Sequence, residues 1–191
     1  MPACPTRINA AAQLLSRGAP ADAALACGGR SISYAALRTA VAQAAATWQD
    51  CGVEPGELLL LRIPAGIEQA VALLGAIWAG AVPVPLVHAG RAHMGHAGEP
   101  HSRSRFILDT TREGYAGCWR DSVLTLDEWR AYFGGSATME AVELAPAAPA
   151  CWTTPRKDGG GACLLTHALA AAQPLPEIAL PGRLVLEPVL P

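Results

Sequence analysis

The hydrophobic pattern of the chain is clearest between residues 58 and 86, where it changes period twice. Residues 58–63 form a short, continuous apolar run, which is typical of a strand that is buried on both faces of a parallel sheet. Residues 67–78 then space their apolar side chains as on one face of a helix, and Gly80 ends that pattern. Because a second apolar run follows at residues 81–86, the stretch predicts a strand, a crossover helix and a parallel strand.

Capping and turn residues divide the chain before this stretch. Asn9 is a suitable cap for a short helix. A Gly-Gly pair in the middle of residues 23–33 predicts a β-hairpin with a two-residue turn. Ser33 is a suitable cap for a long helix over residues 34–50, whose apolar side chains form one stripe.

The chain after residue 86 has weaker patterns. It predicts a long loop at 87–101, a helix at 102–112, strands at 114–119 and 123–126, and a helix at 127–133. It further predicts a linker at 137–150, a helix or a strand followed by a helix at 163–172, and a strand at 183–190. Together the elements predict an α/β fold, a mainly parallel sheet flanked by helices, with one unit at 1–145 and a second at 146–191.

Composition and charge narrow the possible classes of protein. With 191 residues, of which 51% are hydrophobic, the chain is long and apolar enough to bury a core. A formal net charge of −2 provides no basic surface field, so we expect no nucleic-acid partner. The N-terminus lacks the apolar segment of a signal peptide, and glycines and prolines interrupt the uncharged residues 69–87, so we expect no membrane span.

The chain contains two residue types that commonly bind metals, cysteine and histidine. The six cysteines are scattered without a C-x-x-C pair, which predicts neither a zinc site nor a disulfide framework, and we expect reduced thiols in a cytoplasmic protein. The histidines of the expected loop, His88, His93, His96 and His101, are a possible ligand set for Zn²⁺, Ni²⁺ or Cu²⁺. Their spacing has no helical period, so a solvated loop is the simpler interpretation, and a metal-binding protein is an alternative.

Several short motifs occur in a fixed order between residues 31 and 86. They are Ser33-Tyr34 in the long helix, Gly52-Val53 and Pro55-Gly56 before the central strand, and Ala79-Gly80-Ala81 with Val84-Pro85-Leu86 after the crossover helix. In this order they resemble the opening of the adenylate-forming enzymes: AMP-dependent acyl-CoA synthetases, fatty-acyl-AMP ligases and peptide-synthetase adenylation domains. The resemblance implies the N-terminal subdomain of such an enzyme, ATP or AMP with Mg²⁺ as cofactors, and ATP-dependent conversion of a carboxylic acid to an acyl-adenylate.

The phosphate-binding motif of that family runs approximately Y-T-S-G-S-T-G-x-P-K-G, followed by T-H or E-H. Its glycines form a nest of N–H donors, its hydroxyls add further donors, and its lysine supplies positive charge. Residues 152–167 have the matching length and end in the same Thr-His pair. They keep the aromatic residue and two hydroxyls, but Pro155 and Asp158 stand in place of glycines and Gly161 in place of the lysine.

These departures favour a surface loop that no longer binds ATP. Pro155 has no N–H to donate, and a carboxylate about 4 Å from a phosphate costs about 4 kcal/mol at an effective dielectric of about 20. In the alternative, Arg156 and Lys157 supply the charge and the glycines after them form a nest in a shifted register. The residues thereby assigned to nucleotide binding are Thr153, Thr154, Arg156, Lys157, Gly159, Gly160, Gly161, Thr166 and His167.

The resemblance extends over only the first third of a family member. We therefore expect a truncated relative of an AMP-dependent acyl ligase that is not catalytic by itself. An alternative is a non-catalytic interaction module that docks on an acyl-carrier protein or on a complementing ligase fragment. Because a severed domain exposes apolar surface, a homodimer is also expected.

Overall fold

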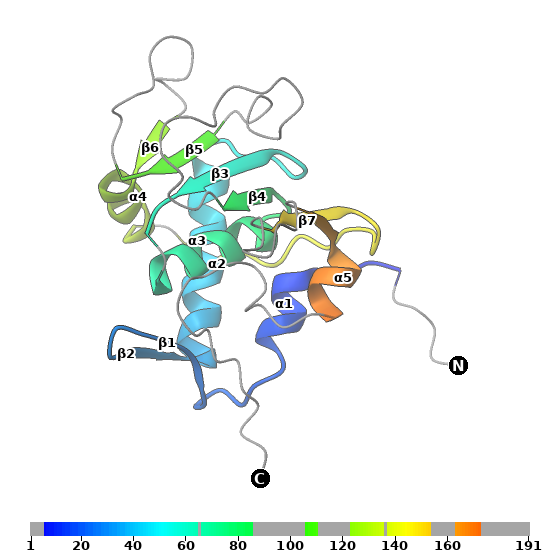
Figure 1. The fold of residues 1–191 in the computed structure, drawn as a ribbon, viewed down its shortest axis with the longest axis horizontal. Helices are drawn as coiled ribbons and strands as arrows, with labels where there is room; N and C mark the ends of the chain where they lie inside the picture. The colour runs from blue at the N-terminus through cyan, green and yellow to red at the C-terminus, as the bar shows by residue number, and fades with distance from the viewer. Residues whose placement is uncertain are drawn as a thin grey trace.

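The computed structural model describes residues 6–64, 66–85, 106–110, 123–135, 137–153 and 163–172. The central element of this part of the protein is a parallel sheet in the order β4-β3-β5-β6 (Figure 1). Its strands are β3 (Leu58–Arg62), β4 (Val82–Pro85), β5 (Phe106–Asp109) and β6 (Val123–Thr125). Helices flank the sheet, so the predicted α/β class with a mainly parallel sheet is confirmed.

Helix α3 (Ile67–Trp78) connects β3 to β4, as the hydrophobic pattern predicts. The two strands are parallel, and Leu60 lies opposite Val84. Gly80 follows the helix with a φ of 82°, a conformation that residues with a side chain rarely adopt. The chain can therefore leave α3 and enter β4 without a longer loop.

Strand β3 is buried on both faces. Leu59 and Leu61 are fully buried in the main core, together with residues of α3 and of helix α2 (Tyr34–Asp50). Leu60 points to the opposite face, where it belongs to a second cluster that also contains Val84, Ile107 and Val123, with Leu58 and Trp152 packed against it. Since successive side chains of a strand alternate between faces, the continuous leucine run matches this double burial.

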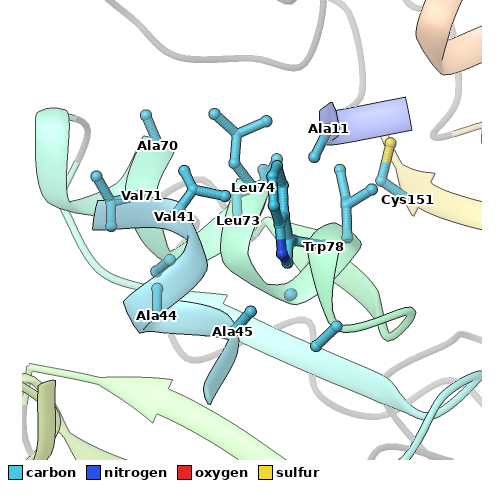
Figure 2. Close-up of a cluster of buried hydrophobic side chains, with 14 of the residues drawn as sticks. Ala11, Val41, Ala44, Ala45, Ala70, Val71, Leu73, Leu74, Trp78 and Cys151 are labelled. Carbon is cyan, nitrogen blue, oxygen red and sulfur yellow. The ribbon is translucent and has the colours of Figure 1, made fainter. Parts of the chain in front are cut away.

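Helices α2 and α3 pack closely because small residues meet at their contact. A Cβ added at Gly75 of α3 would lie 2.5 Å from the Cβ of Ala44 and 3.1 Å from the backbone nitrogen of Ala45. Figure 2 shows both alanines on α2 next to α3, with Trp78 at the centre of the cluster. This close contact lets α2 pack directly on α3, and nine residues of α2 are buried.

The N-terminal helix α1 (Ala10–Leu15) begins at its predicted cap, Asn9. The Asn9 Oδ1 accepts a hydrogen bond from the N–H of Ala12 at 3.2 Å. The Asn9 Nδ2 donates to the carbonyls of Ile77, Trp78 and Val142 at 2.9, 3.2 and 2.8 Å. This buried amide therefore fixes α1 to the end of α3 and to a segment far along the chain.

Two further predicted elements are confirmed on the periphery. The hairpin consists of β1 (Ala23–Cys27) and β2 (Arg30–Ser33), with Gly28 and Gly29 at φ values of 57° and 77°. Helix α4 (Leu126–Phe133) follows β6, and Arg130 joins it to α3 by donating to both carboxylate oxygens of Glu68 at 2.8 and 2.7 Å.

The helix predicted over residues 102–112 is wrong. Residues 106–109 form strand β5, which lies between β3 and β6 and pairs with both in parallel. A short apolar run has no period that distinguishes a buried strand from a buried helix segment. Pairing with two neighbouring strands determines the outcome here.

The linker predicted over residues 137–150 is also wrong, because this segment is hydrogen-bonded to the rest of the fold. The N–H of Met139 donates to the carbonyl of Ala42 at 3.3 Å, and the N–H of Val142 donates to that of Trp78 at 2.8 Å. The alanines and prolines that resemble a linker therefore belong to a segment that contacts the middle of α2 and the C-terminal end of α3.

Several predictions concern parts outside the described residues: the loop at 87–101, the strand at 114–119 and the strand at 183–190. The division into two units at residue 145 stays a prediction. Among the residues that the structure describes, no helix is both long and apolar enough to cross a membrane.

The contact at Gly75 predicts a stability effect. Gly75→Ala should lower the free energy of unfolding by about 1–3 kcal/mol, because the added methyl group forces α2 and α3 apart. Gly134→Ala is the matched control, since a Cβ there meets only ordinary contacts of 3.6 Å or more. Urea denaturation followed by circular dichroism measures both variants, and equal stability of the two would contradict the close contact.

Candidate functional site

The stretch that resembles a phosphate-binding motif begins and ends in an antiparallel pair of strands. These are β7 (Pro149–Trp152) and β8 (Leu164–Thr166), with Cys151 opposite Leu165 and Trp152 opposite Leu164. One residue beyond this pairing, the N–H of Thr153 donates to the carbonyl of Cys163 at 2.8 Å. The N–H of Cys163 donates in turn to the Thr153 hydroxyl at 2.9 Å. The residues of the candidate site thus emerge from a closed hairpin base.

Strand β7 attaches the hairpin to both layers of the core. Cys151 is fully buried in the main core, and Figure 2 places it beside α1. Trp152, which points the other way, packs on the second face of the sheet with Leu60 and Val84. The hairpin base is therefore held from two sides next to β4.

Helix α5 (His167–Ala172) follows β8 directly. The hydroxyl of Thr166 accepts a hydrogen bond from the N–H of Leu169 at 3.4 Å, the arrangement of a helix N-cap. His167 is fully buried, and its Nδ1 accepts a hydrogen bond from the N–H of Ala10 at 3.0 Å. An accepting Nδ1 places the proton of the neutral ring on Nε2.

Helices α1 and α5 lie side by side and are joined at both ends (Figure 1). His167 and Ala10 connect the N-terminal ends, and the guanidinium of Arg17 donates to the carbonyl of Ala171 at the other. Burial lowers the pKa of His167, because the charged ring loses hydration in this apolar contact. His167 therefore fixes the hairpin to the N-terminal helix as a neutral side chain.

The structure describes three of the predicted nucleotide-binding residues. Thr153 lies at the hairpin base, Thr166 caps α5, and His167 is buried against α1. The remaining candidates, Thr154, Arg156, Lys157, Gly159, Gly160 and Gly161, lie outside the described residues. The assignment of all nine to nucleotide binding stays a prediction.

The described cysteines and acidic residues form no second candidate binding site. Cys27, Cys51, Cys151 and Cys163 are free thiols, and burial raises the pKa of Cys151 to about 12, which keeps it protonated at neutral pH. Within the described ranges no group of three or more His, Cys, Asp or Glu side chains is placed to hold a metal ion. The histidine cluster that raised the metal-binding alternative lies outside those ranges.

Sequence reasoning missed an ion pair at the carboxyl ends of the central strands. Arg62 ends β3, Asp109 ends β5, and the two are register partners whose side chains form a salt bridge. Asp109 is 1% exposed and also accepts from the N–H of Thr110 at 2.6 Å. The sequence did contain a signal for this pair, because the apolar runs that form β3 and β5 each end in a charged residue. The pair lies where β4 is added on one side of β3 and β5 on the other, the switch point at which open parallel sheets bind ligands.

A parallel α/β sheet with a closed hairpin beside its edge strand defines the class of fold, and comparison with known proteins gives the family. The sequence model of the AMP-binding enzymes matches residues 13–148. The chain belongs to this family. The match ends just before β7, so the candidate phosphate segment lies beyond it.

Individual relatives agree with this assignment. The salicyl-AMP ligase / salicyl-S-ArCP synthetase of Mycobacterium tuberculosis is 33% identical over 108 residues, which are 56% of this chain and 19% of that protein. NpsA-ThdA, an artificially fused adenylation–PCP di-domain from Klebsiella oxytoca, superimposes with a TM-score of 0.67 at 21% identity. The similarity covers 83% of this chain and 29% of NpsA-ThdA.

The N-terminal subdomain of Klebsiella oxytoca NpsA, in complex with 3-hydroxyanthranilyl-AMSN, superimposes with a TM-score of 0.66 at 22% identity. The similarity covers 87% of this chain and 43% of the NpsA subdomain chain. Identities this low establish the fold alone. The chain spans about a fifth of the length of the curated relative that it matches.

Burial of His167 predicts how stability depends on pH. The unfolded chain has a histidine pKa near 6.5 and the folded chain a lower one, so the unfolded state binds protons preferentially as the pH falls below about 6.5. The contribution of neutral His167 is complete above that pH and is lost as the pH falls toward the folded pKa. The loss is at most about 1.4 kcal/mol per pH unit.

His167→Asn should flatten this dependence, because its side-chain oxygen can accept the Ala10 hydrogen bond without titrating. Urea denaturation of both proteins at pH 5, 6, 7 and 8 measures the difference, in which the four other histidines cancel. Parallel pH curves for the two proteins would show that the pKa of His167 is the same in the folded and unfolded states, which would contradict its lowering by burial.

Proposed function

We propose that this protein takes part in the ATP-dependent activation of an aromatic carboxylic acid to its acyl-adenylate. Membership of the AMP-binding enzyme family, over residues 13–148, carries this proposal. The aromatic class of acid is favoured by the salicyl-AMP ligase that is 33% identical over 108 residues. It is also favoured by NpsA, whose N-terminal subdomain has the same fold and is described in complex with aryl analogues of an adenylate.

In this proposal the β7–β8 hairpin holds the phosphates of the nucleotide. The two strands at the ends of this segment, β7 and β8, are paired with each other. They are also anchored on both hydrophobic clusters, as a binding segment with fixed ends requires. The described hairpin residues, 149–153 and 163–166, include threonine hydroxyls and no carboxylate, whereas Asp158 between them opposes a phosphate and is offset by Arg156 and Lys157. The cations Arg156 and Lys157 and the amides of Gly159–Gly161 would supply the remaining donors.

ATP supplies the adenylyl group when it is bound, and the described residues supply the support of its site. Positioning the reacting carboxylate and stabilising the developing charge require groups that converge from several elements. The 108 residues that match the curated relative are 19% of that protein. We therefore propose that catalysis needs further parts of the fold, in the same polypeptide or in a complementing ligase fragment.

A carrier protein is the partner that the comparisons favour. The curated relative is a salicyl-S-ArCP synthetase, and one similar structure is an adenylation–PCP di-domain that was fused artificially. The second candidate function is accordingly a non-catalytic module that docks on an acyl-carrier protein. It predicts carrier binding that is independent of ATP and of aryl acids.

An exchange assay tests the catalytic proposal. The isolated chain should give no ATP–pyrophosphate exchange above background with salicylate, anthranilate or benzoate, and the chain combined with its complementing fragment should give exchange that depends on the acid. Strong exchange by the isolated chain would refute the need for further parts. No exchange with either preparation, together with carrier binding, would favour the docking module.

A labelling assay tests the nucleotide site separately. Lys157 is the only lysine of the chain, so an amine-reactive reagent modifies Lys157 and the N-terminal amine alone. ATP with Mg²⁺ should slow labelling of Lys157 at least threefold, as read by mass spectrometry, while labelling of the N-terminal amine stays constant as an internal control.

Substitution of the two cations, with a third arginine as the control, tests the same site by its affinity for ATP. Arg156→Gln with Lys157→Gln should weaken ATP binding by roughly tenfold or more, since charge-assisted hydrogen bonds to phosphate contribute about 1.5–3 kcal/mol. Arg30→Gln, at an exposed arginine of the β1–β2 hairpin, should leave ATP binding unchanged. If ATP does not protect Lys157 from labelling and all variants bind ATP with equal affinity, the hairpin is not part of the nucleotide site.

A further inference from the structure

A cavity of about 250 Å³ lies between helix α1 and the segment at 141–143, and the proposed function makes no use of it. At about 30 Å³ for each molecule of liquid water, it holds about eight waters or an organic molecule of similar size. Its lining includes one arginine and one glutamate, Arg7 and Glu143, among uncharged polar and apolar residues. A cavity with both charges in its wall is a candidate binding site for a small molecule.

The cavity is separate from the β7–β8 hairpin and from α5. Helix α1 directs Ala10 toward α5, where the N–H of Ala10 donates to the ring of His167. Ala12, Gln13 and Ser16 lie on the opposite face of α1 at helical spacing, and they line the cavity. No described residue of β7 or β8 contributes to its lining, so the cavity is not part of the candidate nucleotide site.

Arg7 is held at the cavity by contacts with the main chain. Its Nε and Nη2 donate to the carbonyl of Glu143 at 3.3 and 2.7 Å. The backbone beside it is fixed as well, because Ile8 and Leu144 exchange hydrogen bonds at 2.8 and 2.9 Å. A guanidinium has a second edge, formed by Nη1 and Nη2, that binds a carboxylate through two hydrogen bonds. Among the described residues, nothing occupies this second edge of Arg7.

Glu143 contributes the negative charge of the cavity. Arg7 donates to the carbonyl of Glu143 and not to its carboxylate, although the two side chains line the same cavity. None of the ion pairs in the described part of the chain includes Glu143. A cation and an anion therefore stand in one wall without pairing with each other, an arrangement that matches a ligand carrying both charges.

The rest of the lining favours an organic ligand over an inorganic ion. Ala12 and Ala141 are half-buried and provide apolar surface, and Ile8 beside them is buried. Small-molecule sites commonly combine such apolar surface with a few polar groups that orient the ligand. A ligand with an aliphatic part can contact this surface, whereas a bare ion cannot use it.

We propose that this cavity binds a small zwitterion, namely an amino acid with a short aliphatic side chain. The second edge of Arg7 binds the carboxylate of the ligand, and the carboxylate of Glu143 binds its ammonium group. The aliphatic part lies against Ala12 and Ala141. The site is independent of the proposed nucleotide site, so each can fail without the other.

Three ligands built on one carbon skeleton test the proposal. Valine carries both charges, isovalerate lacks the ammonium group, and isobutylamine lacks the carboxylate. Each is titrated into the full 191-residue chain, and NMR follows the backbone amides of Ala12, Gln13, Ala141 and Glu143. Valine should bind with a dissociation constant of about 0.1–10 mM. The other two ligands should bind roughly threefold more weakly or worse, because each loses one ion pair.

Two variants remove the charges of the cavity in turn. Glu143→Gln should weaken valine binding roughly threefold and leave isovalerate binding unchanged. Arg7→Gln should weaken both valine and isovalerate and leave isobutylamine unchanged. Glu140→Gln is the matched control, because Glu140 is an exposed glutamate of the same segment that does not line the cavity. Urea denaturation confirms that all variants are folded.

Three results would overturn the proposal. If valine shifts none of the four amides in the unchanged chain, the cavity does not bind amino acids. If isovalerate binds as tightly as valine, the cavity binds an anion alone and Glu143 has no part in recognition. If Glu140→Gln weakens valine binding as much as Glu143→Gln does, the effect comes from general surface charge and not from this site.

Discussion

The structure depends on the burial of β3 on both of its faces. A parallel strand with four consecutive leucines cannot leave either face in water without exposing apolar surface. One face is covered by α2 and α3, and on the other Leu60 lies in the cluster against which Trp152 packs. Trp152 of β7 is one of the side chains on this second face, so the base of the hairpin packs on the same layer as Leu60.

The helix layer shows how small residues serve this arrangement. The chain is poor in aromatic residues, at 5%, and rich in alanine, so close approach of helices replaces bulky side chains as the means of filling the core. Ala44 and Gly75 allow α2 to contact α3 directly. The few large side chains stand where elements meet: Trp48 donates from its ring nitrogen to the carbonyl of Ala72 at 3.1 Å, and Trp78 donates to that of Met139 at 2.9 Å.

Around this core, long-range polar contacts hold the hairpin in place. Asn9 joins α1 to α3, His167 joins α5 to α1, and the Thr153–Cys163 pair closes the hairpin itself. Each contact uses a polar side chain that is buried or partly buried, and an unpaired polar group in such a place is costly. The family match covers residues 13–148, so Asn9, His167 and the Thr153–Cys163 pair lie outside it, whereas the carbonyls that Asn9 bonds lie within it.

The sequence by itself determined the elements whose signal is local. The β3–α3–β4 crossover, the β1–β2 hairpin and the caps at Asn9 and Ser33 follow from periodicity, turn residues and capping side chains, and each lies within a few residues of its cause. The order of short motifs likewise gave the family. Of the candidate site, the sequence identified the stretch 152–167 and the residue types in it, but it did not predict that β7 and β8 pair at its ends.

Only the tertiary structure decided what depends on distant partners. Residues 106–109 became a strand because β3 and β6 offered pairing on both sides, which a four-residue run cannot indicate. His167, which the motif marks only as the end of a nucleotide segment, was found to accept a hydrogen bond from Ala10, 157 positions earlier in the chain. Thr153 kept its hydroxyl in the motif, but its partner was revealed by the return of the chain at Cys163. The sequence specifies the type of each side chain, whereas its hydrogen-bond partner depends on the packing that brings remote segments together.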